Sequence, residues 1–210
     1  MALIGCGPGD PDLLTLKALQ RLQEADVLVV DRLVNPKILD YARRDAERIF
    51  VGKTPGGPTT SQAEINRILV REASAGKVVA RLKGGDPFIF GRAAEEMAAL
   101  QAAGIGVEVV PGVTAAHACA ARIGLPVTLR ERVRQFSVVT GATADGAPDL
   151  DWQALASPRH GVRRVHGRRQ RAAAAPPPAG RRRRSRHARR HRRERHARGS
   201  SAPSPPRSPT

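Results

Sequence analysis

The stretch that decides the fold is Leu82-Lys83-Gly84-Gly85-Asp86-Pro87-Phe88-Ile89-Phe90-Gly91-Arg92, which follows the apolar run Val78-Val79-Ala80. The apolar run predicts a buried strand. Because the strand gives way to Gly-Gly-Asp-Pro, its backbone lies open just past its carboxyl end. A ligand can approach Gly84 and Gly85 closely, since neither carries a Cβ atom. In open α/β sheets, ligands bind at this edge of the sheet.

Residues 1–157 alternate short β-branched runs with helical patterns. This alternation predicts an α/β fold with an open, mostly parallel sheet and helices on both faces. Helix starts are marked by capping residues at Thr15, Ser61 and Thr114. The expected strands lie at 2–4, 27–30, 49–51, 78–82, 107–110 and 136–139.

Charge divides the chain into two unlike parts. Residues 1–157 carry 18 basic and 18 acidic residues, whereas residues 158–210 carry 18 arginines and one acid, Glu194, so this segment supplies the whole net charge of +17. The segment contains no Leu, Ile, Phe, Tyr, Trp or Met. It therefore cannot build a core, and we expect a disordered, Arg/Pro/Ala-rich low-complexity tail.

Three interpretations of the tail remain. Arg, Pro, Ala, Gly and Ser are the residues that G/C-rich DNA encodes in a wrong reading frame, which favours a frameshift product that replaces a second domain. An inert solvated tail is the second interpretation. A basic arm that binds nucleic acid is the third, although no aromatic residue is present to stack on bases. We expect no nucleic-acid partner.

Other classes of protein are disfavoured by composition. There is no apolar run of membrane-spanning length and no secretory leader, so we expect a cytoplasmic protein without a membrane partner. Cys6 and Cys119 lie in different segments, and nothing near Cys6 predicts a reactive thiol. His117 is the only histidine in residues 1–157, so we expect no metal site.

Unusual residues follow five of the expected strands. Because the carboxyl ends of parallel strands meet at one edge of a sheet, these segments predict a single site. The segments are Gly5-Cys6-Gly7-Pro8-Gly9-Asp10, Asp31-Arg32, Gly52-Lys53, Gly84-Gly85-Asp86 and Pro111-Gly112-Val113-Thr114.

The first of these segments imitates a dinucleotide-binding loop but departs from it. The next glycine of that fingerprint is due at position 10, where Asp10 would oppose a pyrophosphate. Pro8 also removes a backbone donor. A cofactor without phosphate, which carries adenosine and a positive sulfur, fits this loop better.

Single charged residues admit two interpretations each. Asp31 can form a surface ion pair with Arg32, or serve as an acid/base carboxylate at a strand end. Lys53 can be solvated or can contact a ligand. Glu95 and Glu96 are adjacent on an expected helix, and we interpret both as solvated.

Five segments, in this order and spacing, resemble the tetrapyrrole methylases, and within them the uroporphyrinogen-III C-methyltransferases. The resemblance covers about residues 2–156. Two departures are that Ala93-Ala94 stand where the family has Gly-Gly, and that the family's second domain should begin near residue 158. The segments are Gly5 to Thr15, Asp31-Arg32-Leu33-Val34, Val51-Gly52-Lys53, Leu82 to Arg92, and Pro111-Gly112-Val113-Thr114-Ala115.

The resemblance implies a function. S-adenosyl-L-methionine would be the methyl donor, and two methyl transfers to ring carbons of uroporphyrinogen III would give precorrin-2 for sirohaem and cobalamin. It implies Asp31 as the proton acceptor, Lys53 as the proton donor, and a homodimer in the intact family member. Without the second domain, we expect an inactive or poorly folded chain. Alternatives are another precorrin methyltransferase and a basic-tail nucleic-acid-binding derivative. The implied cofactor contacts are Pro8, Gly84, Gly85, Asp86, Ile89, Thr114 and Ala115.

Overall fold

A computed structural model of the chain describes residues 1–52, 60–141, 149–156 and 160–165. The chain divides into two units, Met1–Arg169 and Gln170–Thr210. The second unit lies outside the described residues, and so does most of the Arg-rich tail.

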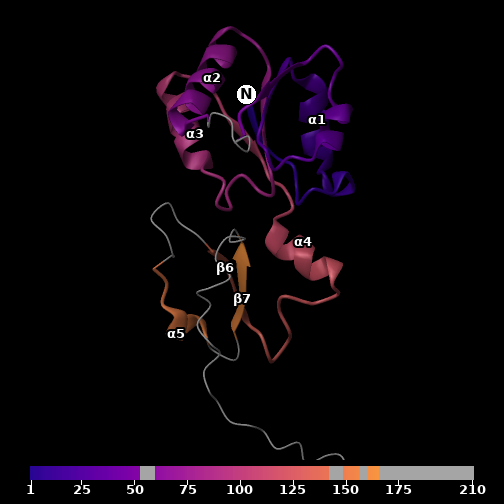
Figure 1. Cartoon of the computed structure of the whole chain (residues 1–210), viewed down its shortest axis with the longest axis vertical. Helices are drawn as coiled ribbons and strands as arrows, with labels where there is room; N and C mark the ends of the chain where they lie inside the picture. Colours follow the sequence, from indigo (N-terminus) through magenta and orange to yellow (C-terminus); the bar gives the residue numbers. More distant parts are fainter. Residues whose placement is uncertain (53–59, 142–148, 157–159, 166–210) are drawn as a thin grey trace, which may run out of the picture. The chain divides into compact units, whose positions relative to one another are not determined.

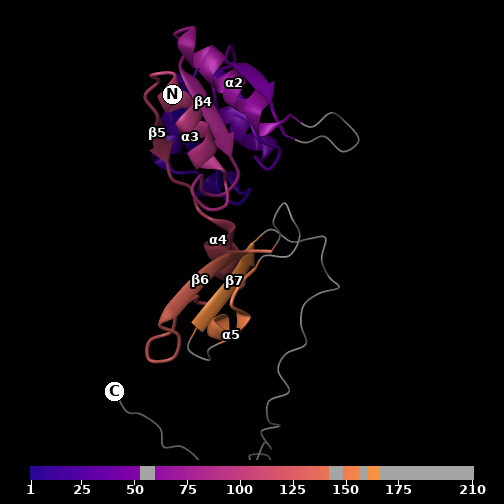
Figure 2. The ribbon, with the colours of Figure 1, turned by 90° about the vertical axis from the view of Figure 1, so that its left-hand side faces the viewer.

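The centre of the first unit is a five-stranded sheet in the order β3-β2-β4-β1-β5, and every neighbouring pair of strands is parallel. Five of the six expected strands are therefore confirmed, with shifts of one or two residues at their ends. Strands β4 and β5 are labelled in Figure 2. The buried residue Ile4 of β1 lies between Leu82 of β4 and Val110 of β5. The strands are β1 (Ala2–Gly5), β2 (Val27–Val30), β3 (Glu47–Phe50), β4 (Val79–Lys83) and β5 (Glu108–Val110).

Helices cover both faces of this sheet, as expected, with α1 on one side and α2 and α3 on the other (Figure 1). Alternate strand residues point to opposite faces. Leu28 and Leu82 therefore pack with Leu22 of α1, while Val79 packs with Leu69 and Leu100 of α2 and α3. The helices are η1 (Pro11–Leu13), α1 (Leu16–Glu24), η2 (Pro36–Tyr41), α2 (Gln62–Ser74), α3 (Ala93–Ala102), α4 (Ala115–Arg122) and α5 (Trp152–Leu155).

The expected caps hold these helix starts in place. Thr15, Ser61 and Thr114 each accept a hydrogen bond from a backbone N–H in the first turn of their helix. Such a bond satisfies a donor that the helix itself leaves unpaired. Within the described ranges, no helix is long and apolar enough to cross a membrane.

The sixth expected strand does not join this sheet. Instead, β6 (Gln135–Thr140) pairs in parallel with β7 (His160–Val165) in a separate two-stranded sheet. Ser137 Oγ and His160 Nε2 lie 2.7 Å apart across the pair. Strand β7 lies beyond the boundary expected at residue 157, so six residues of the Arg-rich segment take part in a sheet; the domain boundary itself stays a prediction.

Candidate active site

The loops that follow β1 and β4 are joined by their backbones. Gly7 N donates to Gly85 O at 3.2 Å, and Gly85 N donates to Gly7 O at 2.7 Å. Both residues have positive φ, +71° and +68°, which side-chain-bearing residues rarely adopt. The two glycines therefore allow the loops to turn towards each other and pair.

The loop after β5 closes onto this pair. A Cβ atom placed on Gly5 would lie 2.5 Å from Gly112 N and 2.8 Å from Gly85 O. A Cβ atom on Gly112 would collide with the same carbonyl oxygen of Gly85. Backbone from the ends of β1, β4 and β5 is thus in direct contact, and only glycine permits this approach.

Asp86 braces the same junction with its carboxylate. Its Oδ2 accepts a hydrogen bond from Gly112 N at 3.0 Å, and its Oδ1 accepts one from Phe88 N at 2.8 Å. Its carbonyl oxygen also accepts from Ile89 N at 3.2 Å. Asp86 therefore fixes the shape of its own loop and ties it to the loop after β5.

The loops after β2 and β3 complete the edge. Asn35 Nδ2 donates to Gly9 O at 2.5 Å, which ties the segment after β2 to the loop after β1. A Cβ atom on Gly84 would lie 2.9 Å from Leu33 Cβ, and one on Gly52 would collide with Arg32. The loops after all five strands thus contact one another at one edge, as expected. We call this set of loops the glycine rim; they meet at Gly5, Gly7, Gly52, Gly84, Gly85 and Gly112.

Asp31 stands at the end of β2 within the glycine rim. Its backbone N–H donates to Leu82 O at 3.0 Å, and its Oδ1 accepts from Arg32 N at 2.8 Å. Among the described residues, its ion-pair partner is Arg81, whose Nη2 lies 3.9 Å from Asp31 Oδ2. The side chain of Asp31 is 36% exposed, so it is open to solvent on one side.

The other expected contact residues lie along the same edge. Pro8 is half-buried between Gly7 and Gly9, and Thr114 caps α4, which begins at Ala115. Lys53 lies outside the described residues. Contacts between the loops thus join Gly84, Gly85 and Asp86 to the segments after β1, β2 and β5. The remaining expected residues follow the ends of β1, β2, β4 and β5 in the chain; they are Pro8, Asp31, Ile89, Thr114 and Ala115.

A buried charge cluster behind the glycine rim escaped the sequence analysis. The expectation that Glu96 is solvated is wrong, because Glu96 is fully buried; its neighbour Glu95 is partly exposed and pairs with Arg92. Glu96 accepts from Lys83 Nζ at 3.0 Å through both oxygens, and from Arg81 Nε at 3.1 Å. Burial, followed by the charge of Arg81, lowers the pKa of Lys83.

Cys6 is buried within the loop after β1, in agreement with the expectation of an unreactive thiol. Burial raises the pKa of Cys6 to about 12, so the thiolate is scarce at neutral pH. Among the residues that the structure describes, no group of three or more His, Cys, Asp or Glu side chains is placed to hold a metal ion.

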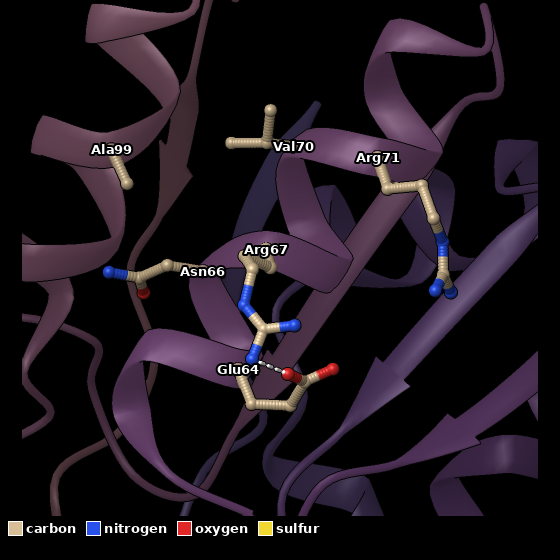
Figure 3. A pocket seen from close by; sticks show the side chains of 6 residues that line it. All are labelled: Glu64, Asn66, Arg67, Val70, Arg71 and Ala99. Atoms are coloured by element: carbon tan, nitrogen blue, oxygen red, sulfur yellow. Dashed lines mark ion pairs between the residues drawn. The ribbon is translucent and has the colours of Figure 1, made fainter.

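An open hollow of about 440 Å³ lies elsewhere, over α2 and α3 (Figure 3). Glu64 and Arg67 form an ion pair within it. The hollow contains none of the residues expected at the site, and it is therefore distinct from the glycine rim. Its lining residues are Glu64, Asn66, Arg67, Val70, Arg71 and Ala99.

The parallel sheet and the glycine rim define the class of open-sheet α/β proteins whose loops at the carboxyl edge form a ligand site. The chain belongs to the tetrapyrrole (corrin/porphyrin) methylases, since the sequence profile of that family matches residues 1–177.

Relatives and solved structures agree with this family. Siroheme synthase from Pseudomonas aeruginosa (strain UCBPP-PA14) is 56% identical over 156 residues, which are 74% of this chain and 34% of that protein. Siroheme synthase 2 from Cronobacter sakazakii is 53% identical over 159 residues, which are 76% of this chain and 35% of that protein. The chain thus spans about a third of the length of the curated relatives it matches.

Among solved structures, uroporphyrin-III C-methyltransferase from Thermus thermophilus in complex with S-adenyl homocysteine shares 47% identity at a TM-score of 0.59, over 71% of this chain and 59% of that chain. A cobalt precorrin-4 methyltransferase shares 33% identity at a TM-score of 0.61, over 70% of this chain and 60% of that chain.

The contact between Gly112 and the loops after β1 and β4 can be tested by adding one methyl group. We expect Gly112→Ala to lower the free energy of unfolding by about 1–3 kcal/mol, because the added Cβ atom would collide with backbone atoms of Gly85 and Gly5, and moving them costs free energy. Gly106→Ala is the matched control, since a Cβ atom there has no heavy atom within 4 Å. Chemical denaturation measures both variants; equal stabilities would contradict the close approach.

Proposed function

We propose that residues 1–157 form the cofactor-binding part of an S-adenosylmethionine-dependent uroporphyrinogen-III C-methyltransferase. The observation that carries the proposal is the glycine rim, in which backbone from five parallel strands meets at the edge where such folds bind ligands. Membership of the tetrapyrrole methylases and the relative solved with S-adenyl homocysteine support it.

The chemistry of the glycine rim suits a sulfonium cofactor. Asp10, Asp31 and Asp86 all follow strand ends at this edge, which favours a cation and disfavours a pyrophosphate. A Cβ atom on Gly85 would point into open space, so the backbone there is accessible to a ligand. We therefore assign cofactor contacts to the backbone of Gly84, Gly85 and Asp86, and to the neighbouring residues Pro8, Ile89, Thr114 and Ala115.

The protein's contribution to methyl transfer is mainly positioning. S-adenosylmethionine supplies an electrophilic methyl group on its sulfonium sulfur. An electron-rich ring carbon must meet that methyl group in line, so a rigid glycine rim lowers the barrier by holding two reactants in one orientation. Asp86 maintains that rigidity through its two backbone hydrogen bonds.

We assign proton transfer to two residues that follow β2 and β3 in the sequence. We assign Asp31 as the proton acceptor for the ring, because its carboxylate is half-exposed at the glycine rim. We assign Lys53 as the proton donor from its place in the family pattern. The carboxylates of uroporphyrinogen III would pair with basic groups such as Arg32.

We propose precorrin-2 as the product, for sirohaem and cobalamin synthesis, and a cytoplasmic homodimer for the intact family member. Methylation at a different ring carbon is the second candidate, favoured by the 33% identity to the cobalt precorrin-4 methyltransferase.

We also propose that the Arg-rich segment from residue 158 reflects a shifted reading frame and impairs catalysis. Its 18 arginines replace the Val- and Leu-rich sequence that a second α/β domain requires. A nucleic-acid-binding arm would instead be a genuine product of the gene and would bind duplex DNA in a salt-dependent way.

Cofactor binding can be tested on the chain as it stands. We expect S-adenosylhomocysteine to bind, and Gly85→Ala to weaken that binding at least about tenfold, since its methyl group would occupy the ligand space. Gly104→Ala is the matched control: Gly104 has φ +72° and equally open surroundings, but it follows α3. Isothermal titration calorimetry measures the affinity of each variant for S-adenosylhomocysteine. Wild-type affinity in both variants would contradict the proposal.

The proton-transfer roles require a restored second domain. We expect sequencing of the gene to reveal an inserted or deleted base near codon 158, and correction of the frame to give methyl transfer to uroporphyrinogen III. In that corrected protein, Asp31→Asn and Lys53→Met should each lower turnover by a factor of about 10²–10⁴ with cofactor binding retained. A sound frame would overturn the frameshift proposal, and unchanged turnover would remove both residues from the mechanism.

A further inference from the structure

The buried charge cluster contains more positive than negative charge. Arg81 and Lys83 both lie on the face of β4 that packs against α2 and α3, because they are two residues apart on one strand. Glu96 of α3 is the fully buried anion between them, and the side chains of Arg81 and Lys83 are 3% and 4% exposed. Two buried cations thus share one buried anion.

Asp31 supplies the missing negative charge from the glycine rim. Its Oδ2 lies 3.9 Å from Arg81 Nη2, and its charge also favours the protonated form of Lys83. Opposite charges attract strongly where water is excluded. Asp31 is therefore the second anion of this charge cluster.

Arg81 is held rigidly enough to orient this carboxylate. Its Nε donates to Glu96 Oε1, and its Nη1 lies within hydrogen-bond distance of Val29 O and Leu82 O. Gln62 from the start of α2 also donates to Glu96 Oε1, at 3.4 Å. Every side of the guanidinium except the one facing Asp31 is thus fixed by partners in the core.

We propose that Arg81 is a positioning residue that orients the Asp31 carboxylate through this ion pair, and that Glu96 anchors Arg81 for this purpose. The inference rests on the proposed function in that Asp31 is the proton acceptor there. When the ring C–H bond breaks, its electron pair stays on the ring and the proton forms an O–H bond on Asp31. The proton then passes to water through the exposed side of Asp31.

The test compares variants of the charged groups that face Asp31. Among the described residues these are Arg81 and Lys83 from β4, with Glu96 from α3 behind them and Arg32 next in sequence. Arg81→Met leaves Glu96 paired with Lys83, and Lys83→Met leaves Glu96 paired with Arg81. Each variant removes one buried cation, but only the first removes the contact with Asp31.

The experiment records the carboxyl carbon chemical shift of Asp31 by NMR in the full chain at neutral pH, with Asp31→Asn for assignment. We expect Arg81→Met to move that signal, because the carboxylate loses the cation that holds its orientation. Lys83→Met should move the signal less, since it leaves the contact between Arg81 and Asp31 in place. An unmoved signal in Arg81→Met, or an equal change in both variants, would overturn the proposal.

A second variant covers the case in which Arg81→Met does not fold. Asp31→Asn alters a half-exposed side chain, and it should move the titration of the Lys83 ammonium to lower pH, since the cluster loses its second anion. An unchanged Lys83 titration would overturn the proposal. Both measurements are made without cofactor, so their outcome is separate from S-adenosylhomocysteine binding, on which the proposed function depends.

Discussion

The paired hydrogen bonds between Gly7 and Gly85 are the constraint on which the site depends. They join the loops after β1 and β4, which are neighbouring parallel strands, and so continue the contact between these strands beyond the end of the sheet. With these two loops joined, positions 5 and 112 must also be glycine. The loop after β5 lies so close to the loops after β1 and β4 that a Cβ atom at either position would collide with backbone. Asp86 then closes the arrangement with hydrogen bonds to two loops. An edge of closely packed backbone follows from four glycines and one carboxylate.

Local sequence patterns predicted most of the fold because they act over short distances. The caps at Thr15, Ser61 and Thr114, and the apolar runs of the five sheet strands, are each decided within a few residues. Strand β6 was placed correctly in sequence but assigned to the wrong sheet. Its partner, His160–Val165, lies in an Arg-rich segment that has no strand pattern of its own.

The site was predictable in its outline and not in its electrostatics. Glycines after successive parallel strands are enough to predict one shared edge. The cluster of Arg81, Lys83 and Glu96 was not predicted, because two charged residues on one face of a strand indicate a buried pair only when their distant partner is known. That partner lies on α3, where Glu96 beside Glu95 looks like part of a solvated surface. The ion pair that reaches Asp31 likewise becomes visible only in three dimensions.

The most direct test of the account is to map the bound ligand onto the backbone. Amide chemical shifts of the full chain would be followed by NMR while S-adenosylhomocysteine is added. The account predicts that the largest changes occur at the glycine rim, at Gly7, Gly85 and Gly112. Changes confined to the hollow over α2 and α3, around Arg67 and Arg71, would contradict it, and so would a spectrum that does not change.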